Sequence, residues 1–242
     1  QAMDELAERL RIDPMDLRLK NCLRPGDDTA HGQPLGNDVA LIECLQQVRK
    51  DSDWDRKRRE FDAYNQTAGL APRRGIGVAC FFHGLSLGAE GDDFAISTIQ
   101  VNNDYSVTLT SGLTDYGTGS RTVYTLIAAE VLGVRPERIQ MHRPDTDTAV
   151  ASGPTVASRA TVLGGNAARV AAERLNSLLV ATAAEMFSCD PVQVLRDGEL
   201  YIGPNEEPVT FENIVDYAKR CGLTLSAHGK WSAPHIHWSM ES

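Results

Sequence analysis

Residues 105–133 carry the pattern that decides the fold, and they read YSVTLTSGLTDYGTGSRTVYTLIAAEVLG. The first part alternates apolar and polar residues, with Val107 and Leu109 on one side, which predicts a strand over Tyr105–Thr110. The last part repeats apolar residues at helical spacing over about Ser120–Leu132 and is followed directly by a glycine. The stretch therefore predicts a strand, a glycine-rich connection and a helix.

Further strands are expected on both sides of this stretch. They are predicted over Gly75–Phe82, Asp93–Val101, Arg138–His142, Val192–Leu195, Leu200–Ile202 and Leu223–Ala227. The Asn103-Asp104 pair and the Asp197-Gly198 pair predict tight hairpin turns. Strands joined by short turns pair antiparallel, so most of the sheet is expected to be antiparallel.

Two further helices complete the predicted domain. One runs roughly from Ala157 to Phe187 and is the longest periodic signal in the chain. The other is capped by Thr210 and ends at Cys221. The predicted fold class is α+β, a two-layer domain in which helices pack on a mainly antiparallel sheet.

Residues 1 to about 65 show helical patterns only. Ala2–Leu10 is one expected helix, and Asp13 with Pro14 predicts the N-cap and first turn of a second. A third is expected around residues 39–48, and a charged fourth over Asp53–Asn65. We therefore predict two domains, a helical lead-in over residues 1–70 and the α+β domain over residues 71–242.

The composition argues against several classes of function. The chain has 242 residues, 24 of them basic and 33 acidic, so its formal net charge of −9 disfavours a nucleic-acid or anionic-membrane surface. No run approaches the ~18 consecutive apolar residues that a membrane span needs, and the first residues are no cationic signal peptide. We predict a cytoplasmic protein. The five cysteines have no tight spacing, which indicates free, mostly buried thiols.

Two segments could bind a ligand. The loop Ser111–Thr122 has glycines that let backbone amides approach a ligand, and the N-terminus of the following helix favours an anion. The segment Asp145–Arg159 leads into a second helix N-terminus, and both segments carry a Ser-Arg pair near the helix start. Two such N-termini could hold two ends of one phosphorylated ligand. An ordinary strand-to-helix turn and a chance likeness of common capping residues remain open as alternatives.

Neither of the two candidate metal-ligand pairs is well supported. Asp145 and Asp147 lack a third ligand, so an Asx turn or a cap is the favoured interpretation. His235 and His237 would lie on one face of a strand, but no nearby residue completes a site apart from the terminal Glu241. No metal ligand is predicted in this chain.

Several short segments follow one another in a recognisable order. They are Met3–Ala7, Ile12–Asn21, Arg74–Ala79, the loop with Gly117, Gly119 and Thr122, Ala128–Val134, Asp145-Thr146 and Ala157–Arg159. Each is moderately specific, and their succession resembles the molybdenum-binding subunit of the xanthine dehydrogenase and aldehyde oxidase family. The resemblance covers nearly the whole chain.

The resemblance implies an activity, a cofactor and partners. In that family the subunit binds a molybdenum–pterin cofactor, in bacteria commonly as a cytosine dinucleotide. It hydroxylates an aldehyde, a purine or another N-heterocycle with oxygen taken from water. Electrons leave through iron–sulfur and flavin subunits or domains, which fits the unclustered cysteines here. The implied partners are these redox modules, the remaining part of the molybdenum subunit and a small-molecule substrate.

The resemblance also implies which residues bind the cofactor. They are Gly117, Thr118, Gly119, Ser120, Arg121 and Thr122 in the first loop and Thr155, Ala157, Ser158 and Arg159 in the second. The family loop usually has glutamine at the position of Thr118, which is shorter and cannot make the same two-ended amide contacts.

No catalytic residue is expected in this chain. The family's substrate-activating glutamate lies near the end of the subunit, so the chain resembles an internal segment that is inactive and cofactor-free when isolated. One part of a subunit that is split over two chains is a further possibility. The alternative is a non-catalytic anion-binding, nucleotide-binding or scaffold module that shares the fold, for which Thr118 is the main argument.

Overall fold

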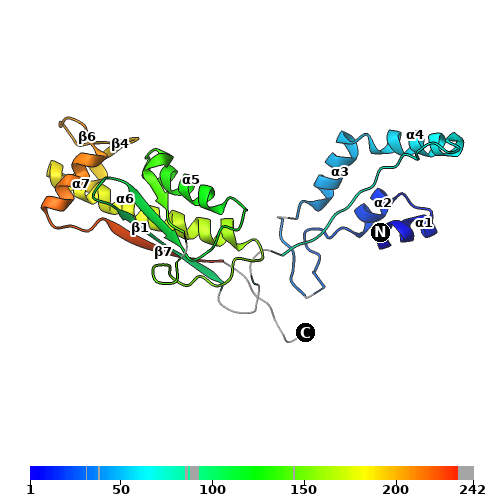
Figure 1. Ribbon diagram of the computed structural model, residues 1–242, viewed down its shortest axis with the longest axis horizontal. Coiled ribbons are helices and arrows are strands. Elements are labelled where there is room, and N and C mark those ends of the chain that lie inside the picture. Colours follow the sequence, from blue (N-terminus) through cyan, green and yellow to red (C-terminus); the bar gives the residue numbers. More distant parts are fainter. Residues whose placement is uncertain (31, 38, 85–86, 88–92, 144, 234–242) are drawn as a thin grey trace. The chain divides into compact units, whose positions relative to one another are not determined.

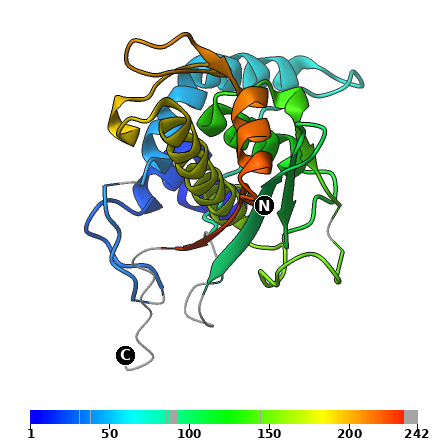
Figure 2. The same cartoon turned by 90° about the vertical axis from the view of Figure 1, so that its left-hand side faces the viewer.

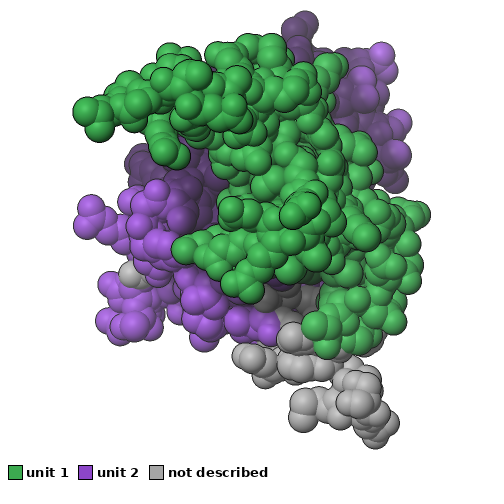
Figure 3. Space-filling view, turned by 90° about the vertical axis from the view of Figure 1, so that its right-hand side faces the viewer, with its two compact units in different colours: residues 1–83, 237–242 green, residues 84–236 purple. Residues whose placement is uncertain are grey.

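The structure is a computed structural model, and it describes all residues except 31, 38, 85–86, 88–92, 144 and 234–242. The chain divides into two compact units, of which the first holds residues 1–83 and the second residues 84–236 (Figure 3). Each unit has its own hydrophobic core. The predicted His235/His237 pair lies outside the described residues.

The first unit is helical. Its helices are α1 (Ala2–Leu10), α2 (Pro14–Asn21), α3 (Leu41–Asp51) and α4 (Trp54–Thr67) (Figure 1). The predicted cap of α2 is confirmed, because the Asp13 carboxylate accepts a hydrogen bond from the Met15 amide at 2.8 Å. The same carboxylate oxygen accepts from the Trp54 indole N–H at 3.0 Å, which ties the start of α4 to α2.

The strand predicted over Gly75–Phe82 is wrong. These residues belong to no strand, although alternate side chains, Ile76, Val78 and Cys80, are partly buried against the helical core. Helices offer no free backbone donors or acceptors to an extended neighbour, and among the described residues no strand pairs with this segment. The alternation of apolar and polar residues therefore indicates an extended, half-buried segment and does not by itself indicate a strand of a sheet.

The second unit is built on a four-stranded sheet. Its strands are β1 (Phe94–Val101), β2 (Val107–Ser111), β3 (Ile139–Met141) and β7 (Ser226–Ser232), in the order β3-β2-β1-β7. β1 is antiparallel to both neighbours, and β3 is parallel to β2. The predicted α+β class with a mainly antiparallel sheet is confirmed. The last strand begins at Ser226 and not at Leu223, because the preceding residues form the turn out of a helix.

The predicted hairpin between β1 and β2 is confirmed. The Asn102 amide donates to the Ser106 carbonyl at 2.8 Å, which closes the turn around Asn103-Asp104. Tyr105 takes the left-handed conformation with φ of 66°. The Asp104 carboxylate accepts from the Ser106 amide and hydroxyl, so the turn satisfies its own polar groups.

Helices cover one face of this sheet. They are α5 (Ser120–Leu132), α6 (Gly165–Phe187) and α7 (Phe211–Arg220) (Figure 2). α6 lies so close to β7 that a Cβ atom on Gly229 would be 2.3 Å from the Ala167 carbonyl oxygen. A π-helical turn, Ala160–Gly164, precedes α6, so the long helix starts later than the predicted Ala157. Ala157 and Ser158 adopt positive φ values and cannot continue a right-handed helix.

A small second sheet packs beside α7. Its strands are β4 (Leu195–Asp197), β5 (Leu200–Ile202) and β6 (Val209–Thr210), all antiparallel. The predicted hairpin at Asp197-Gly198 is confirmed, but the first strand lies at 195–197 because Pro191–Gln193 form a 3₁₀ turn. The predicted Thr210 cap is also confirmed, since its hydroxyl accepts from the Asn213 amide.

Two expectations from composition can be compared with the structure. Among the described residues no helix is long and apolar enough to cross a membrane. All five cysteines are free thiols, as predicted, but only Cys22 is buried. Cys44 and Cys221 are exposed, so the expectation of mostly buried thiols is wrong.

Candidate functional site

The first predicted loop wraps around a carboxylate of its own. Asp115 accepts hydrogen bonds from the amides of Gly117 at 2.9 Å, Gly119 at 3.1 Å and Arg121 at 3.1 Å. The amide of Arg121, followed by that of Gly117, lowers the pKa of the Asp115 carboxyl below its ordinary value. The anion that the sequence predicted at the N-terminus of α5 is therefore present within the chain.

Both glycines of this loop are needed for their backbone conformation. Gly117 has a φ of 111° and Gly119 of 78°, which side-chain-bearing residues rarely adopt. A Cβ atom on either would meet nothing within 4 Å, and Thr118 between them is exposed. The outer side of the loop therefore presents bare backbone and one hydroxyl to open space.

The remaining residues of the first loop point in different directions. Ser120 is buried, whereas Thr122 is exposed. The Arg121 guanidinium donates to the Met141 carbonyl at 2.8 Å, which joins α5 to β3. Beside it lies an open pocket of about 430 Å³, lined by Asp115, Arg121, Thr122, Thr125, Ile139 and Met141.

The structure brings the two predicted loops together. The Thr114 amide donates to the Thr155 hydroxyl at 2.8 Å. Next to this contact, Gly112 lies so close to the second loop that a Cβ atom there would be 2.1 Å from the Val150 carbonyl oxygen. The two loops thus form one continuous surface.

The starts of the two helices are also joined. The buried Tyr124 of α5 donates its hydroxyl to the Ala160 carbonyl at 2.8 Å. A Cβ atom on Gly164 would be 2.2 Å from that hydroxyl oxygen, so only glycine fits there. Burial raises the pKa of Tyr124 to about 12, and the phenol stays protonated at neutral pH.

The second loop contains two strained residues in sequence. Ala157 has a φ of 50° and Ser158 of 59°, and the left-handed conformation costs roughly 1–2 kcal/mol for each such residue. Ser158 is exposed and Ala157 and Thr155 are partly buried. The strain turns the chain sharply before the π-helical turn and leaves the Ser158 side chain at the surface.

Arg159 is turned inward. It is 1% exposed, and its guanidinium donates to the Asp93 carboxylate at 2.6 Å, to Phe94 O at 2.9 Å and to Ser152 O at 2.7 Å. A further N–H donates to the Pro154 carbonyl. Four protein acceptors therefore occupy this side chain, and it anchors the second loop to the start of β1.

The upstream part of the second segment forms a turn. The Asp145 carboxylate accepts from the Asp147 amide at 2.9 Å, which confirms the Asx turn that the sequence favoured. No group of three or more His, Cys, Asp or Glu side chains that could hold a metal ion occurs in the described part of the chain.

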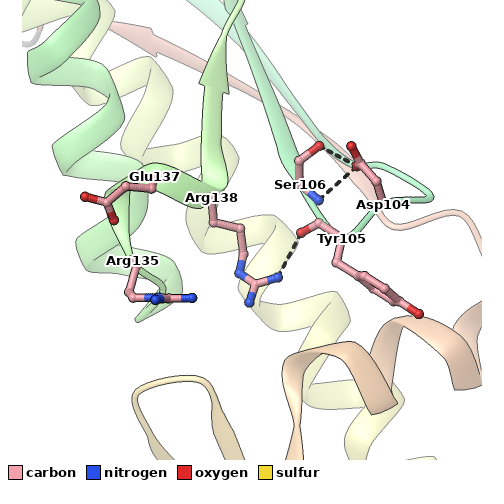
Figure 4. Close-up of a pocket in the computed structure, with 6 residues that line it drawn as sticks. All are labelled: Asp104, Tyr105, Ser106, Arg135, Glu137 and Arg138. Atoms are coloured by element: carbon pink, nitrogen blue, oxygen red, sulfur yellow. Dashed lines mark hydrogen bonds between the residues drawn. The ribbon is translucent and has the colours of Figure 1, made fainter.

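A second pocket, of about 240 Å³, lies at the β1–β2 turn (Figure 4). Arg138 points toward this turn and donates to the Tyr105 carbonyl at 3.1 Å. Its guanidinium also pairs with the carboxylates of Glu199 at 2.7 Å and Glu212 at 2.6 Å. Arg138 joins the β1–β2 turn, the β4–β5 turn and α7, which is a structural role.

Sequence analysis missed the residues that hold the two loops. Asp115 carries a local signal, because it precedes a Gly-x-Gly loop and can bind its amides. Asp93, Ser152 and Tyr124 carry none, since their partners lie 36 to 66 residues away in the chain.

The comparisons with known proteins decide the family. The model described as "Molybdopterin cofactor-binding domain" matches residues 47–242. The chain belongs to this family. The chain is 34% identical over 210 residues to the putative xanthine dehydrogenase molybdenum-binding subunit of Escherichia coli strain K12, a match covering 86% of this chain and 27% of that protein. It is 33% identical over 176 residues to the aldehyde oxidoreductase of Megalodesulfovibrio gigas, covering 72% of this chain and 18% of that protein.

Solved structures agree. The aldehyde oxidoreductase of Desulfovibrio desulfuricans ATCC 27774 matches with a TM-score of 0.68 and 29% identity over 98% of this chain and 23% of its own. The reconstituted CO dehydrogenase of Oligotropha carboxidovorans matches with a TM-score of 0.77, over 98% of this chain and 32% of its own, and its 24% identity shows the fold alone. The predicted resemblance to the xanthine dehydrogenase and aldehyde oxidase family is confirmed. The chain spans about a quarter of the length of the first curated relatives that it matches.

Proposed function

We propose that this chain is the part of a molybdenum hydroxylase subunit that supplies two loops to the molybdenum–pterin cofactor. The residues proposed for this role are Gly117–Thr122 within the first loop, Ser111–Thr122, and Thr155–Arg159 within the second, Asp145–Arg159. The observation that carries the proposal is the 2.8 Å contact between the Thr114 amide and the Thr155 hydroxyl, which places both loops on one surface. The family match supports the same cofactor class.

The residues on this surface leave room for a group that lies close to the backbone and bonds to hydroxyls. Gly117 and Gly119 have no side chains, and the space where a Cβ would lie is open, so a ligand can approach the backbone closely. Thr118 and Ser158 contribute exposed hydroxyls from the two loops. Thr155 fixes the distance between the loops, and the inward-facing Arg159 holds the second loop in place.

When bound, the molybdenum–pterin group supplies two-electron redox chemistry. The chain's own contribution is to bind and orient that group, in the cytosine dinucleotide form or in another. In the complete enzyme the substrate is an aldehyde, a purine or another N-heterocycle, and electrons pass to iron–sulfur and flavin modules. Relatives named as xanthine dehydrogenase, aldehyde oxidoreductase and nicotine 6-hydroxylase support this substrate range.

The test is the molybdenum content of the complete subunit, measured by elemental analysis. Ser158→Ala is expected to lower the molybdenum content, because Ser158 presents its hydroxyl at the proposed surface. The matched control is Ser177→Ala, which changes an exposed serine on α6 far along the chain from both loops. Equal molybdenum content in the two variants would contradict the site. Hydroxylase turnover by this 242-residue chain alone would contradict its proposed role as an inactive part.

A non-catalytic scaffold module that shares the fold is the second candidate. Asp115 favours it, because this carboxylate already occupies the amides at the start of α5. A complete subunit that is purified folded and without molybdenum would support the module over the enzyme.

A further inference from the structure

β7 pairs with the start of β1 on one side, but on the side that faces β2 the start of β1 is completed by side chains. β2 pairs with β1 only from Ser97 onward, because β2 ends at Ser111 and the chain turns away at Gly112. Beyond that point the Ile96 amide donates to the Ser152 hydroxyl at 3.0 Å. The Phe94 carbonyl accepts from the Arg159 guanidinium. The second loop therefore takes the place that β2 leaves open.

Arg159 and Asp93 close this arrangement as a buried ion pair. Their side chains are 2% and 3% exposed, and the distance from Nε to Oδ1 is 2.6 Å. The other Asp93 oxygen accepts from the Leu87 amide at 2.6 Å. A guanidinium with a single charge partner and three carbonyl acceptors is held in one orientation, since moving it would leave buried groups unpaired.

We call the contacts of Asp93, Ser152 and Arg159 with the start of β1 the clamp. The clamp explains how Ala157 and Ser158 keep their strained backbone conformation. Ala157 and Ser158 lie between the two points at which the loop is attached to β1, at Ser152 and at Arg159. Residues other than glycine keep the left-handed conformation only where the surrounding structure holds them in it. Resting on the proposed cofactor role of this loop, we propose that Asp93 is a positioning residue, which acts through Arg159 to hold Thr155 and Ser158 in the geometry that binds the cofactor. The Ser152 hydroxyl holds the start of the same loop on the Ile96 amide.

The first experiment needs no cofactor. Amide hydrogen exchange of the 242-residue chain is followed by mass spectrometry in peptides that cover residues 150–160. Asp93→Ala is expected to raise exchange there about tenfold or more, because local opening no longer breaks the ion pair. The matched control Glu173→Gln removes the carboxylate of an exposed Arg169–Glu173 pair on α6 and is expected to change nothing in these peptides. Exchange equal to that of the control would overturn the clamp.

A double variant separates positioning from stability. Asp93→Leu with Arg159→Met replaces the buried pair by apolar side chains, a change that often preserves stability. Methionine cannot donate to the carbonyls of Phe94, Ser152 and Pro154. The unpaired carbonyls lower the thermal midpoint, so exchange in residues 150–160 is compared with exchange in α6. We expect fast exchange in the loop while α6 exchanges as in the unchanged chain. Slow exchange in the double variant would show a merely stabilising pair and would overturn the positioning role.

The second experiment measures molybdenum in the complete subunit that carries the double variant. Its retention of molybdenum after dialysis is expected to fall about tenfold, because only a fraction of molecules hold the loop in the binding geometry. Full retention despite fast loop exchange would overturn the positioning role. A subunit that lacks molybdenum even without substitutions would instead refute the proposed function, and the exchange data would still decide the clamp.

Discussion

Gly112→Ala tests the packing that joins the two loops. The new methyl carbon would lie 2.1 Å from the Val150 carbonyl oxygen and 2.7 Å from the Ser152 hydroxyl oxygen. Ordinary van der Waals contact begins at 3.4 Å, so the second loop must move by more than an ångström. The closest atom belongs to the backbone, and a rotamer change cannot relieve the clash.

The expected cost has two parts. Overpacking of a tight site costs about 1–3 kcal/mol. The displaced loop also loses the hydrogen bond between the Ile96 amide and the Ser152 hydroxyl, worth about 1 kcal/mol. The free energy of unfolding should therefore fall by about 2–4 kcal/mol, which for a unit of this size lowers the thermal midpoint by about 5–15 °C.

Thermal unfolding followed by circular dichroism measures this change, with two glycines as controls. Gly77→Ala has open space around it and no positive φ, so it should leave the midpoint unchanged. Gly117→Ala also has open space but a φ of 111°, and should cost about 1 kcal/mol. A Gly112→Ala midpoint no lower than that of Gly77→Ala would refute the close contact between the loops.

Two further outcomes are expected. Burial would raise the pKa of Glu199, but hydrogen bonds from the Arg138 guanidinium and the Arg135 amide outweigh it and hold that pKa below the ordinary 4.5. A lowered pKa in the folded state stabilises the fold above pH 4.5, and this stabilisation is lost as the pH falls through the folded-state value. The thermal midpoint of the unchanged chain should therefore drop more steeply below pH 4.5 than that of Glu199→Gln. Midpoints that fall equally with pH in both proteins would contradict the stabilising pair of Arg138 and Glu199. In the complete subunit, Thr118→Gln should leave the molybdenum content unchanged and alter turnover or substrate range, which elemental analysis and a panel of purines, aldehydes and pyridines would check. A loss of molybdenum would place Thr118 among the residues that retain the cofactor.

Local signals explain the parts of the fold that could be predicted. The caps at Asp13 and Thr210 and the turns at Asn103-Asp104 and Asp197-Gly198 depend on neighbours within a few residues, and all are confirmed. The strand predicted at Gly75–Phe82 failed for the opposite reason. Alternating burial depends on the segment itself, whereas a strand also needs a partner supplied from elsewhere in the chain.

The candidate site also has features that local sequence signals predict and features that depend on distant residues. A glycine loop before a helix predicted a place for an anion, and the position of Asp115 just before that loop is the local signal that this carboxylate fills it. The contact between Thr114 and Thr155 joins residues 41 positions apart, and the pair of Asp93 and Arg159 joins residues 66 positions apart. No periodicity reports such contacts, because they arise only after the sheet and helices have packed.

The attachment of the second loop at Ser152 and Arg159 also restricts how the chain can vary in length. The backbone between these residues and the guanidinium contact to the Ser152 carbonyl form a closed ring. An added residue inside the ring would have to be accommodated next to Ala157 and Ser158, which already adopt unfavourable backbone angles. The preceding turn at Asp145–Ala149 is largely exposed, and the bonds that close it run to Asp145 within the turn and not to a buried side chain. Insertions that lengthen this segment should therefore be tolerated before Val150 and rejected between Ser152 and Arg159.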